Sequence, residues 1–153
     1  SDEQFQKVSG YIESGKSEGG EIIAGGKYDN SNGGHFVHPT VFSKTNADMK
    51  LVKEEIFGPV VCAQPFSDES LEKIASDANN TSFGLAASVW TKDISVAHKL
   101  AAKIRAGTVW VNCHNIFDAS LPFGGYKESG WGREMGHEVL KNYTEVKAVT
   151  VSL

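Results

Sequence analysis

Hydrophobic periodicity alternates between the strand and helix patterns from residue 60 to residue 112, and this alternation most constrains the fold. Short apolar runs at 60–66, 85–90 and 108–112 have the length and residue types of strands. The two segments between them repeat apolar residues at helical spacing. Strands that alternate with helices predict parallel strands joined by crossover connections. The expected fold class is therefore α/β, a parallel-sheet domain with three layers in the order α/β/α.

The two helical segments carry start signals that locate their first turns. Ser67 or Asp68 is expected to cap the first helix and Asp93 the second, because short polar side chains accept hydrogen bonds from the first free amides. Gly107 is expected to end the second helix. The first helix has its apolar residues on one face: Leu71, Ile74, Ala75 and Ala78.

The part before residue 60 is less regular. Residues 21–24 have the pattern of a strand, and the polar, glycine-rich residues 25–34 have that of a mobile loop. Pro39 lacks an amide donor, so residues 36–42 are expected to form an edge strand or an interrupted one. Three apolar residues at helical spacing predict a first helix: Phe5, Val8 and Ile12.

The end of the chain has the alternation of a strand. Residues 143–153 follow a short helix expected at 135–142. A terminal strand without an obvious partner in its own chain invites pairing with another chain. We therefore divide the chain into a main part, 1–142, and an oligomerisation strand, 143–153.

Composition excludes several classes of function. The 153 residues carry 15 Lys and Arg against 19 Asp and Glu, a formal net charge of −4, so nucleic acid is not an expected partner. Neither a membrane span of about 20 apolar residues nor a signal peptide is visible, so we expect a cytoplasmic protein. Cys62 and Cys113 are expected to be buried and unpaired. His35 and His38 have no third ligand nearby, so no metal is expected.

The segment 121–134, LPFGGYKESGWGRE, fits neither a linker nor a core element. Each glycine would cost about 0.5–1 kcal/mol inside a helix or strand, and flexible linkers contain few large aromatics. The remaining interpretation is an ordered loop that places aromatic residues beside a ligand. Ligands of parallel sheets bind outside the carboxyl ends of the strands, and we expect the loop there, because the chain leaves the strand at 108–112 at that end. A second unusual stretch, KEEIFGPVV, spans residues 53–61.

These two stretches resemble the C-terminal part of the NAD(P)-dependent aldehyde dehydrogenase family. The resemblance covers nearly the whole chain, and the order and number of its motifs make coincidence a poor explanation. It implies an enzyme that oxidises an aldehyde to a carboxylate with NAD, or NADP, as hydride acceptor. The other matching motifs are QFxxVxGYI at 4–12, PTVF at 39–42, GLAA at 84–87, AGTVWVNC at 106–113 and YTEVK at 143–147.

The resemblance implies roles for four residues at the cofactor. Glu55 would accept hydrogen bonds from both hydroxyls of the nicotinamide ribose, a task that suits an acceptor-only carboxylate. Phe57 would lie near the nicotinamide ring. Gln4 and Lys7 would contact the ribose of the adenosine half. From the residues alone, these positions could equally be surface charges, a core aromatic and a solvated helix face.

The resemblance also implies roles at the substrate. Phe117 and Phe123 would line the aldehyde pocket, where aromatics exclude water, and Asn115 would lie on the same side. Glu134 would belong to a proton path that leads away from the site. The alternatives are core packing for the two aromatics and a favourable charge at a helix N-terminus for Glu134.

The family's cysteine nucleophile, glutamate base, asparagine oxyanion donor and pyrophosphate-binding turn correspond to sequence before residue 1. Neither Cys62 nor Cys113 matches the nucleophile. We therefore expect the chain to be the C-terminal part of an aldehyde dehydrogenase and to be inactive alone. Two alternatives stay open: an interaction fragment that pairs with a full-length enzyme or with itself, and a shortened or proteolysed piece. The residues specify neither the aldehyde nor the choice between NAD and NADP.

Overall fold

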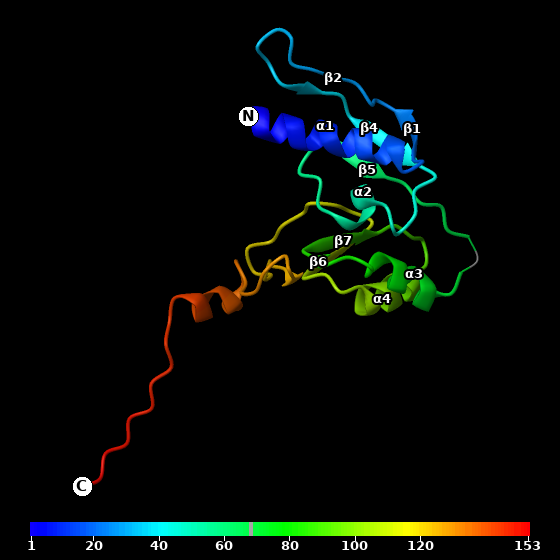
Figure 1. Ribbon diagram of the computed structural model, residues 1–153. Helices are drawn as coiled ribbons and strands as arrows, with labels where there is room; N and C mark the ends of the chain where they lie inside the picture. The colour runs from blue at the N-terminus through cyan, green and yellow to red at the C-terminus, as the bar shows by residue number, and fades with distance from the viewer. Residues whose placement is uncertain (68) are drawn as a thin grey trace. The chain divides into compact units, whose positions relative to one another are not determined.

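The computed structural model describes residues 1–67 and 69–153, and the chain divides into two compact units, Ser1–Glu69 and Ser70–Leu153 (Figure 1). In the first unit, β4 lies between two neighbours, antiparallel to β1 and parallel to β5. A separate two-stranded pair joins β2 to β3. The elements of this unit are α1 (Asp2–Ser17), β1 (Glu21–Ala24), β2 (Tyr28–Asp29), β3 (Phe36–Val37), β4 (Thr40–Ser43), α2 (Lys50–Lys53) and β5 (Val60–Cys62).

Helix α1 forms where the apolar spacing predicted it. Ser1 caps it, since the Ser1 hydroxyl accepts a hydrogen bond from the Gln4 amide at 3.3 Å. The chain leaves the helix through Gly19, whose φ of +96° is strained for residues with a side chain. The apolar face of α1 packs on the sheet and α2 in one core cluster: Val8, Tyr11, Ile12, Phe42, Met49 and Leu51.

One prediction for this unit needed correction, and another was confirmed in one of its two forms. Residues 25–34 are not wholly a loop, because β2 lies within them and pairs with β3 as a short antiparallel ladder. The interruption at Pro39 is confirmed, since β3 ends at Val37 and β4 begins at Thr40. However, β4 is the central strand of its sheet and not an edge. The proline is tolerated because it lies between the strands and not within the ladder.

The second unit contains the predicted strand–helix–strand crossover. Strands β7 and β8 are parallel, with Ala86 opposite Thr108, and α4 connects them. Helices α3 and α4 pack on this pair through Ala75, Val89 and Leu100. The elements are α3 (Leu71–Ala78), β6 (Phe83–Gly84), β7 (Ala86–Val89), α4 (Ile94–Lys103), β8 (Thr108–Val111), β9 (Tyr126–Lys127) and the 3-10 helix η1 (His137–Asn142).

The caps of these helices are partly as predicted. Asp93 caps α4, and its carboxylate accepts hydrogen bonds from the Ser95 and Val96 amides at 2.8 and 3.2 Å. Ser70 caps α3, where Ser67 or Asp68 was expected, because its hydroxyl accepts from the Lys73 amide at 3.2 Å. Asp68 lies outside the described residues.

The α/β class is confirmed, but the expected partner of one strand is not. The apolar runs at 60–66, 85–90 and 108–112 were expected to share one parallel sheet. Among the described residues, β5 pairs with β4, while β7 and β8 form their own pair. Periodicity correctly predicted a strand within each of these three runs, and it carries no information about which strands become neighbours.

The terminal segment 143–153 forms no strand with the described part of the chain, and Figure 1 shows it extended. Its β-branched side chains Val146, Val149 and Val151 are exposed. The expected strand is therefore not formed within this chain, and pairing with another chain stays a prediction.

Three further findings concern the chain as a whole. Cys62 and Cys113 are unpaired and half-buried, where fully buried residues were expected. No helix within the described residues has the length and apolarity needed to cross a membrane. The same residues contain no group of three or more His, Cys, Asp or Glu side chains arranged to hold a metal ion.

Candidate functional site

The glycine-rich segment 121–134 is an ordered loop, as predicted, but its place differs from the prediction. We expected it at the carboxyl ends of the parallel strands. Instead β9, inside the loop, pairs with β6, with Tyr126 opposite Gly84, just before β7 begins. The Gly84 amide also donates to the Ser129 hydroxyl at 3.0 Å. The loop therefore returns to the amino ends of β7 and β8, although it leaves from the carboxyl end of β8.

A glycine immediately before β8 allows this return. A Cβ atom on Gly107 would lie 1.6 Å from the Gly124 carbonyl oxygen and 2.7 Å from its carbonyl carbon. The two backbones therefore approach more closely than any side chain would permit. Two glycines of the loop itself are confined in the same way, since an added Cβ would lie 2.6 Å from the Gly132 carbonyl oxygen at Gly124 and 2.7 Å from the Ser129 carbonyl oxygen at Gly125.

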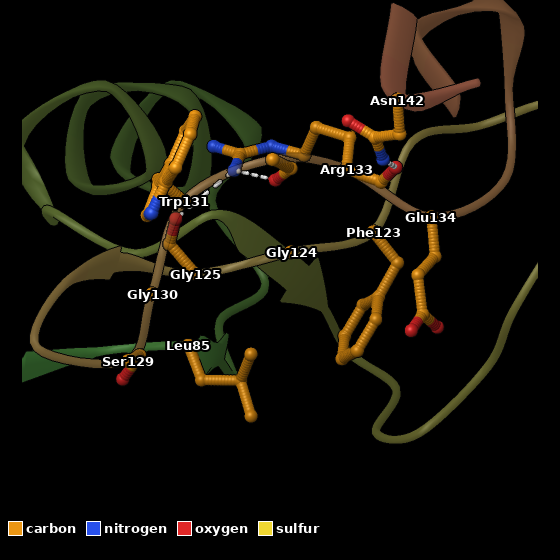
Figure 2. A pocket seen from close by; sticks show the side chains of 11 residues that line it. Leu85, Phe123, Gly124, Gly125, Ser129, Gly130, Trp131, Arg133, Glu134 and Asn142 are labelled. Atoms are coloured by element: carbon orange, nitrogen blue, oxygen red, sulfur yellow. Dashed lines mark hydrogen bonds between the residues drawn. The ribbon is translucent and has the colours of Figure 1, made fainter. Parts of the chain in front are cut away.

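The loop borders an open hollow of about 430 Å³ in the second unit. Phe123 and Glu134 form an antiparallel bridge across it, with amide-to-carbonyl distances of 2.8 and 2.7 Å. Residues opposite each other in such a bridge project to the same side, and Figure 2 shows both side chains pointing the same way. The other side chains that line the hollow are Leu85, Ser129, Trp131, Arg133 and Asn142.

Arg133 and Trp131 contribute differently to this hollow. The Arg133 guanidinium donates to the Gly125 carbonyl at 3.0 Å and to the Gly132 carbonyl, and it lies 5.1 Å from the centre of the Tyr126 ring. This cation therefore holds the loop together. Trp131 is 99% exposed. An aromatic side chain this exposed gains nothing from packing within the chain, so its surface is available to a partner or ligand.

Phe117 and Phe123 lie in contact and form an aromatic wall, of which only Phe123 lines the hollow, so their shared role in an aldehyde pocket stays a prediction. Their rings meet edge to face with centres 5.0 Å apart, and Phe117 meets the Trp110 ring in the same way at 5.6 Å. The Trp110 indole donates to the Ile116 carbonyl at 2.7 Å, which fixes the intervening turn. Asn115 lies in that turn with φ of +57° and is exposed, outside the lining of the hollow.

Trp110 was not singled out from the sequence, and it is expected to position this wall. Replacing Trp110 by phenylalanine removes the indole donor and part of a buried ring, which together should lower the free energy of unfolding by about 1–3 kcal/mol. Denaturant unfolding measures the change. Trp90→Phe is the matched control, since Trp90 is largely exposed. Equal unfolding energies for the two variants would show that the bond does not order the turn.

Two of the residues expected at the cofactor meet in the first unit. The Gln4 side-chain amide donates to the Phe57 carbonyl at 2.5 Å, and both residues line a second hollow of about 260 Å³. The Phe57 ring is 73% exposed. Glu55 and Lys7 are exposed and lie outside the lining of this hollow. The expected contacts of Gln4 and Lys7 with an adenosine ribose stay predictions.

The sequence reasoning missed the contact that supports this segment. The hydroxyl of Tyr11, a residue that is 8% exposed, donates to the Glu54 carboxylate at 2.6 Å. This hydrogen bond, then burial and then the charge of Glu54 raise the pKa of Tyr11 above its ordinary value. The available signal was weak, because a tyrosine beside a helical apolar stripe is usually only a core residue.

The chemistry of Cys62 argues against a nucleophilic role. Burial raises the pKa of the Cys62 thiol, and its sulfur lies 3.5 Å from the Leu51 carbonyl oxygen. A raised pKa leaves little thiolate, which is the reactive form, at neutral pH. The half-buried Cys113 follows β8 and is outside the lining of the loop hollow.

The parallel β–α–β crossover, the glycine loop and the aromatic wall form a candidate site on an α/β fold. Residues 1–149 match the model of the Aldehyde dehydrogenase family, and the chain belongs to this family.

Three relatives illustrate the similarity. The chain is 51% identical over 151 residues to aldehyde dehydrogenase 1A1 of Gallus gallus and 49% identical over 150 residues to mitochondrial aldehyde dehydrogenase of Homo sapiens, covering 99% and 98% of this chain. It is also similar to a solved NAD+ complex of aldehyde dehydrogenase from Bacillus cereus, with a TM-score of 0.92, 52% identity and 100% of this chain covered. The chain spans 29%, 28% and 30% of the lengths of these relatives.

Proposed function

We propose that this chain is part of an enzyme that oxidises an aldehyde to a carboxylate with NAD+, or NADP+, as hydride acceptor. The observation that carries the proposal is the family match over residues 1–149. The solved Bacillus cereus relative, which is similar along the whole of this chain, is an NAD+ complex, and this favours NAD. The cofactor would supply the hydride acceptor, and this chain's residues would bind and orient it.

The chemistry of the segment 54–58 fits a nicotinamide nucleoside. The exposed Glu55 carboxylate is an acceptor without donors, which suits the two hydroxyls of a ribose. The exposed Phe57 ring offers a flat apolar face to a nicotinamide ring. Gln4 holds the Phe57 backbone, and Lys7, one turn further along α1, is available to a second ribose.

The aromatic wall in the second unit suits the aldehyde. Phe117 and Phe123 would exclude water from the substrate, and Asn115 would influence which aldehyde fits from the neighbouring turn. The pairing of Glu134 with Phe123 keeps a carboxylate beside this wall, where it could carry a proton away. The raised pKa of Cys62 supports the view that the nucleophile is supplied from outside these 153 residues.

The proposal extends to organisation and location. Residues 1–142 would form part of the catalytic domain, and 143–153 would form a strand that joins copies of the enzyme. The exposed β-branched side chains of the tail support such pairing. The cytoplasm is the proposed location.

Aldehyde-dependent reduction of NAD+ tests the enzymatic proposal. The full-length polypeptide of the gene that encodes this chain should produce NADH when an aldehyde is added, measured by NADH absorbance. The 153-residue chain should stay at the blank rate, because neither of its cysteines matches the nucleophile and the thiol of Cys62 is little ionised. An inactive full-length polypeptide would contradict the proposed activity. Turnover by the 153-residue chain would contradict the assignment of the nucleophile.

A second candidate function is a non-catalytic interaction fragment that pairs with a full-length aldehyde dehydrogenase or with itself. The exposed tail favours it, because residues 143–153 have no strand partner in the described part of the chain. Co-elution of the 153-residue chain with full-length enzyme would support this candidate. A variant ending at residue 142 is the matched control and should not co-elute if the tail makes the contact.

A further inference from the structure

We propose that α1 acts as a clamp on the segment 54–58, and that Tyr11 is a positioning residue for Glu55 and Phe57. The inference rests on the proposed function, in which these two residues meet the nicotinamide half of the cofactor. It assigns to Tyr11 a role in cofactor affinity that comes from its hydrogen bond to Glu54 and not from contact with the cofactor.

Three contacts from one face of α1 fasten the segment. The Gln4 side-chain amide donates to the Phe57 carbonyl at 2.5 Å, and the Tyr11 hydroxyl donates to the Glu54 carboxylate at 2.6 Å. Between them Val8 packs on Gly58, where an added Cβ would lie 2.6 Å from the Val8 Cγ2 atom. Positions 4, 8 and 11 share a helix face because residues three or four apart are neighbours on a helix. The segment is therefore held near both of its ends.

The attachment at Glu54 is the stronger one. Tyr11 is 8% exposed, and its hydrogen bond to a carboxylate is charge-assisted. The Lys50 ammonium lies 5.3 Å from the Tyr11 ring centre and 3.9 Å from the same carboxylate, which adds a cation to the group. The Glu54 amide donates to the Lys50 carbonyl at 3.0 Å at the end of α2. Glu54 is thus fixed through both its side chain and its backbone.

Because both ends of the segment 54–58 are held, the side chains between them are either packed on the core or exposed to solvent. The backbone is extended at Glu54 and turns at Phe57, where the Gly58 amide donates to the Ile56 carbonyl at 2.7 Å. Ile56 packs against the core cluster, while its two neighbours in sequence, Glu55 and Phe57, are exposed. The clamp therefore presents a carboxylate and an aromatic ring before any ligand arrives. Such preorganisation reduces the ordering cost of binding.

The experiment compares Tyr11→Phe with Tyr28→Phe in the full-length polypeptide of the gene that encodes this chain. Tyr28→Phe is a matched control, because its hydroxyl also donates to a glutamate, Glu13, at 3.1 Å, away from the segment 54–58. Each variant keeps the ring and removes one hydroxyl. The measurements are the KM and kcat for NAD+ with an aldehyde, and the hydrogen-exchange rates of the amides in residues 54–58.

We expect Tyr11→Phe to raise the KM for NAD+ about three- to ten-fold, because the variant loses one hydrogen bond to a charged group. It should also accelerate exchange in residues 54–58, while Tyr28→Phe changes neither. If Tyr11 had a purely structural role, Tyr11→Phe would lower the free energy of unfolding but would leave the KM for NAD+ and the exchange rates of residues 54–58 equal to those of Tyr28→Phe. That result would overturn the proposal. If the unsubstituted polypeptide does not reduce NAD+, the proposed function fails, and the exchange rates still decide whether Tyr11 clamps the segment.

Discussion

Replacing Gly107 by alanine is expected to separate the glycine loop from β8 and to destabilise the second unit severely. The new methyl carbon would lie 1.6 Å from the Gly124 carbonyl oxygen, which belongs to backbone and cannot rotate away as a flexible side chain could. Overpacking of this kind costs about 1–3 kcal/mol and occasionally more, and a backbone clash belongs at the upper end. Denaturant unfolding and amide exchange in residues 108–111 and 124–130 measure the loss.

Gly10→Ala is the matched control for this prediction. Gly10 lies within α1, and an added Cβ there has no atom within 4 Å. The same substitution should therefore be harmless at Gly10, or stabilising by about 0.5–1 kcal/mol, because alanine has the higher helix propensity. Unchanged exchange in residues 124–130 of Gly107→Ala would show that the close approach does not hold the loop. In the full-length polypeptide, loss of the loop should also displace Phe123 and Glu134 and remove activity.

Replacing Phe42 by alanine is expected to destabilise the first unit by about 3–5 kcal/mol, the usual cost of removing a buried aromatic ring. Phe42 is 0% exposed, and it packs with Ile12 and Leu51 in the core between α1 and the sheet. Its ring also fills the space beside Gly15, where an added Cβ would lie 2.9 Å from two ring carbons. The cavity cannot close easily, because helix, sheet and α2 all border it. Denaturant unfolding measures the effect.

Phe66→Ala provides the comparison for the core substitution, since Phe66 belongs to the same unit and is 70% exposed. It should change the free energy of unfolding by no more than about 0.5 kcal/mol, as surface substitutions usually do. Amide exchange should accelerate in β4 and α1 for Phe42→Ala. Equal stability of the two variants would mean that the core cluster does not stabilise the first unit as its burial indicates.

Local patterns in the sequence were sufficient for most elements. The helix over Phe5, Val8 and Ile12, the strand at 21–24 and the cap at Asp93 were all predicted, because each depends on residues within about one helical turn or on strict alternation. The glycine-rich motif was correctly predicted to be an ordered loop. Periodicity did not predict the contact of Phe117 with Phe123, and their shared role in an aldehyde pocket, which the resemblance implied, stays a prediction.

Two of the misplaced predictions concern partners distant in sequence. The β5 run was expected beside β7 but pairs with β4, and the glycine loop was expected at the carboxyl strand ends but docks at the amino ends. A third prediction missed locally: Ser70 caps α3 instead of Ser67, because several short polar residues precede the helix and each is able to accept the capping hydrogen bond. An apolar alternating run specifies a strand with a buried face, and many neighbours satisfy that requirement equally well.

The order of amino acids thus decided the helices, the strands, the unusual glycine loop and membership of the aldehyde dehydrogenase family. Folding in three dimensions decided what supports the candidate sites. The Tyr11 hydroxyl reaches Glu54 across 43 positions, and the Gly84 amide reaches Ser129 across 45. Helical and strand periodicities act over a few residues, whereas these hydrogen bonds require elements distant in sequence to be packed side by side.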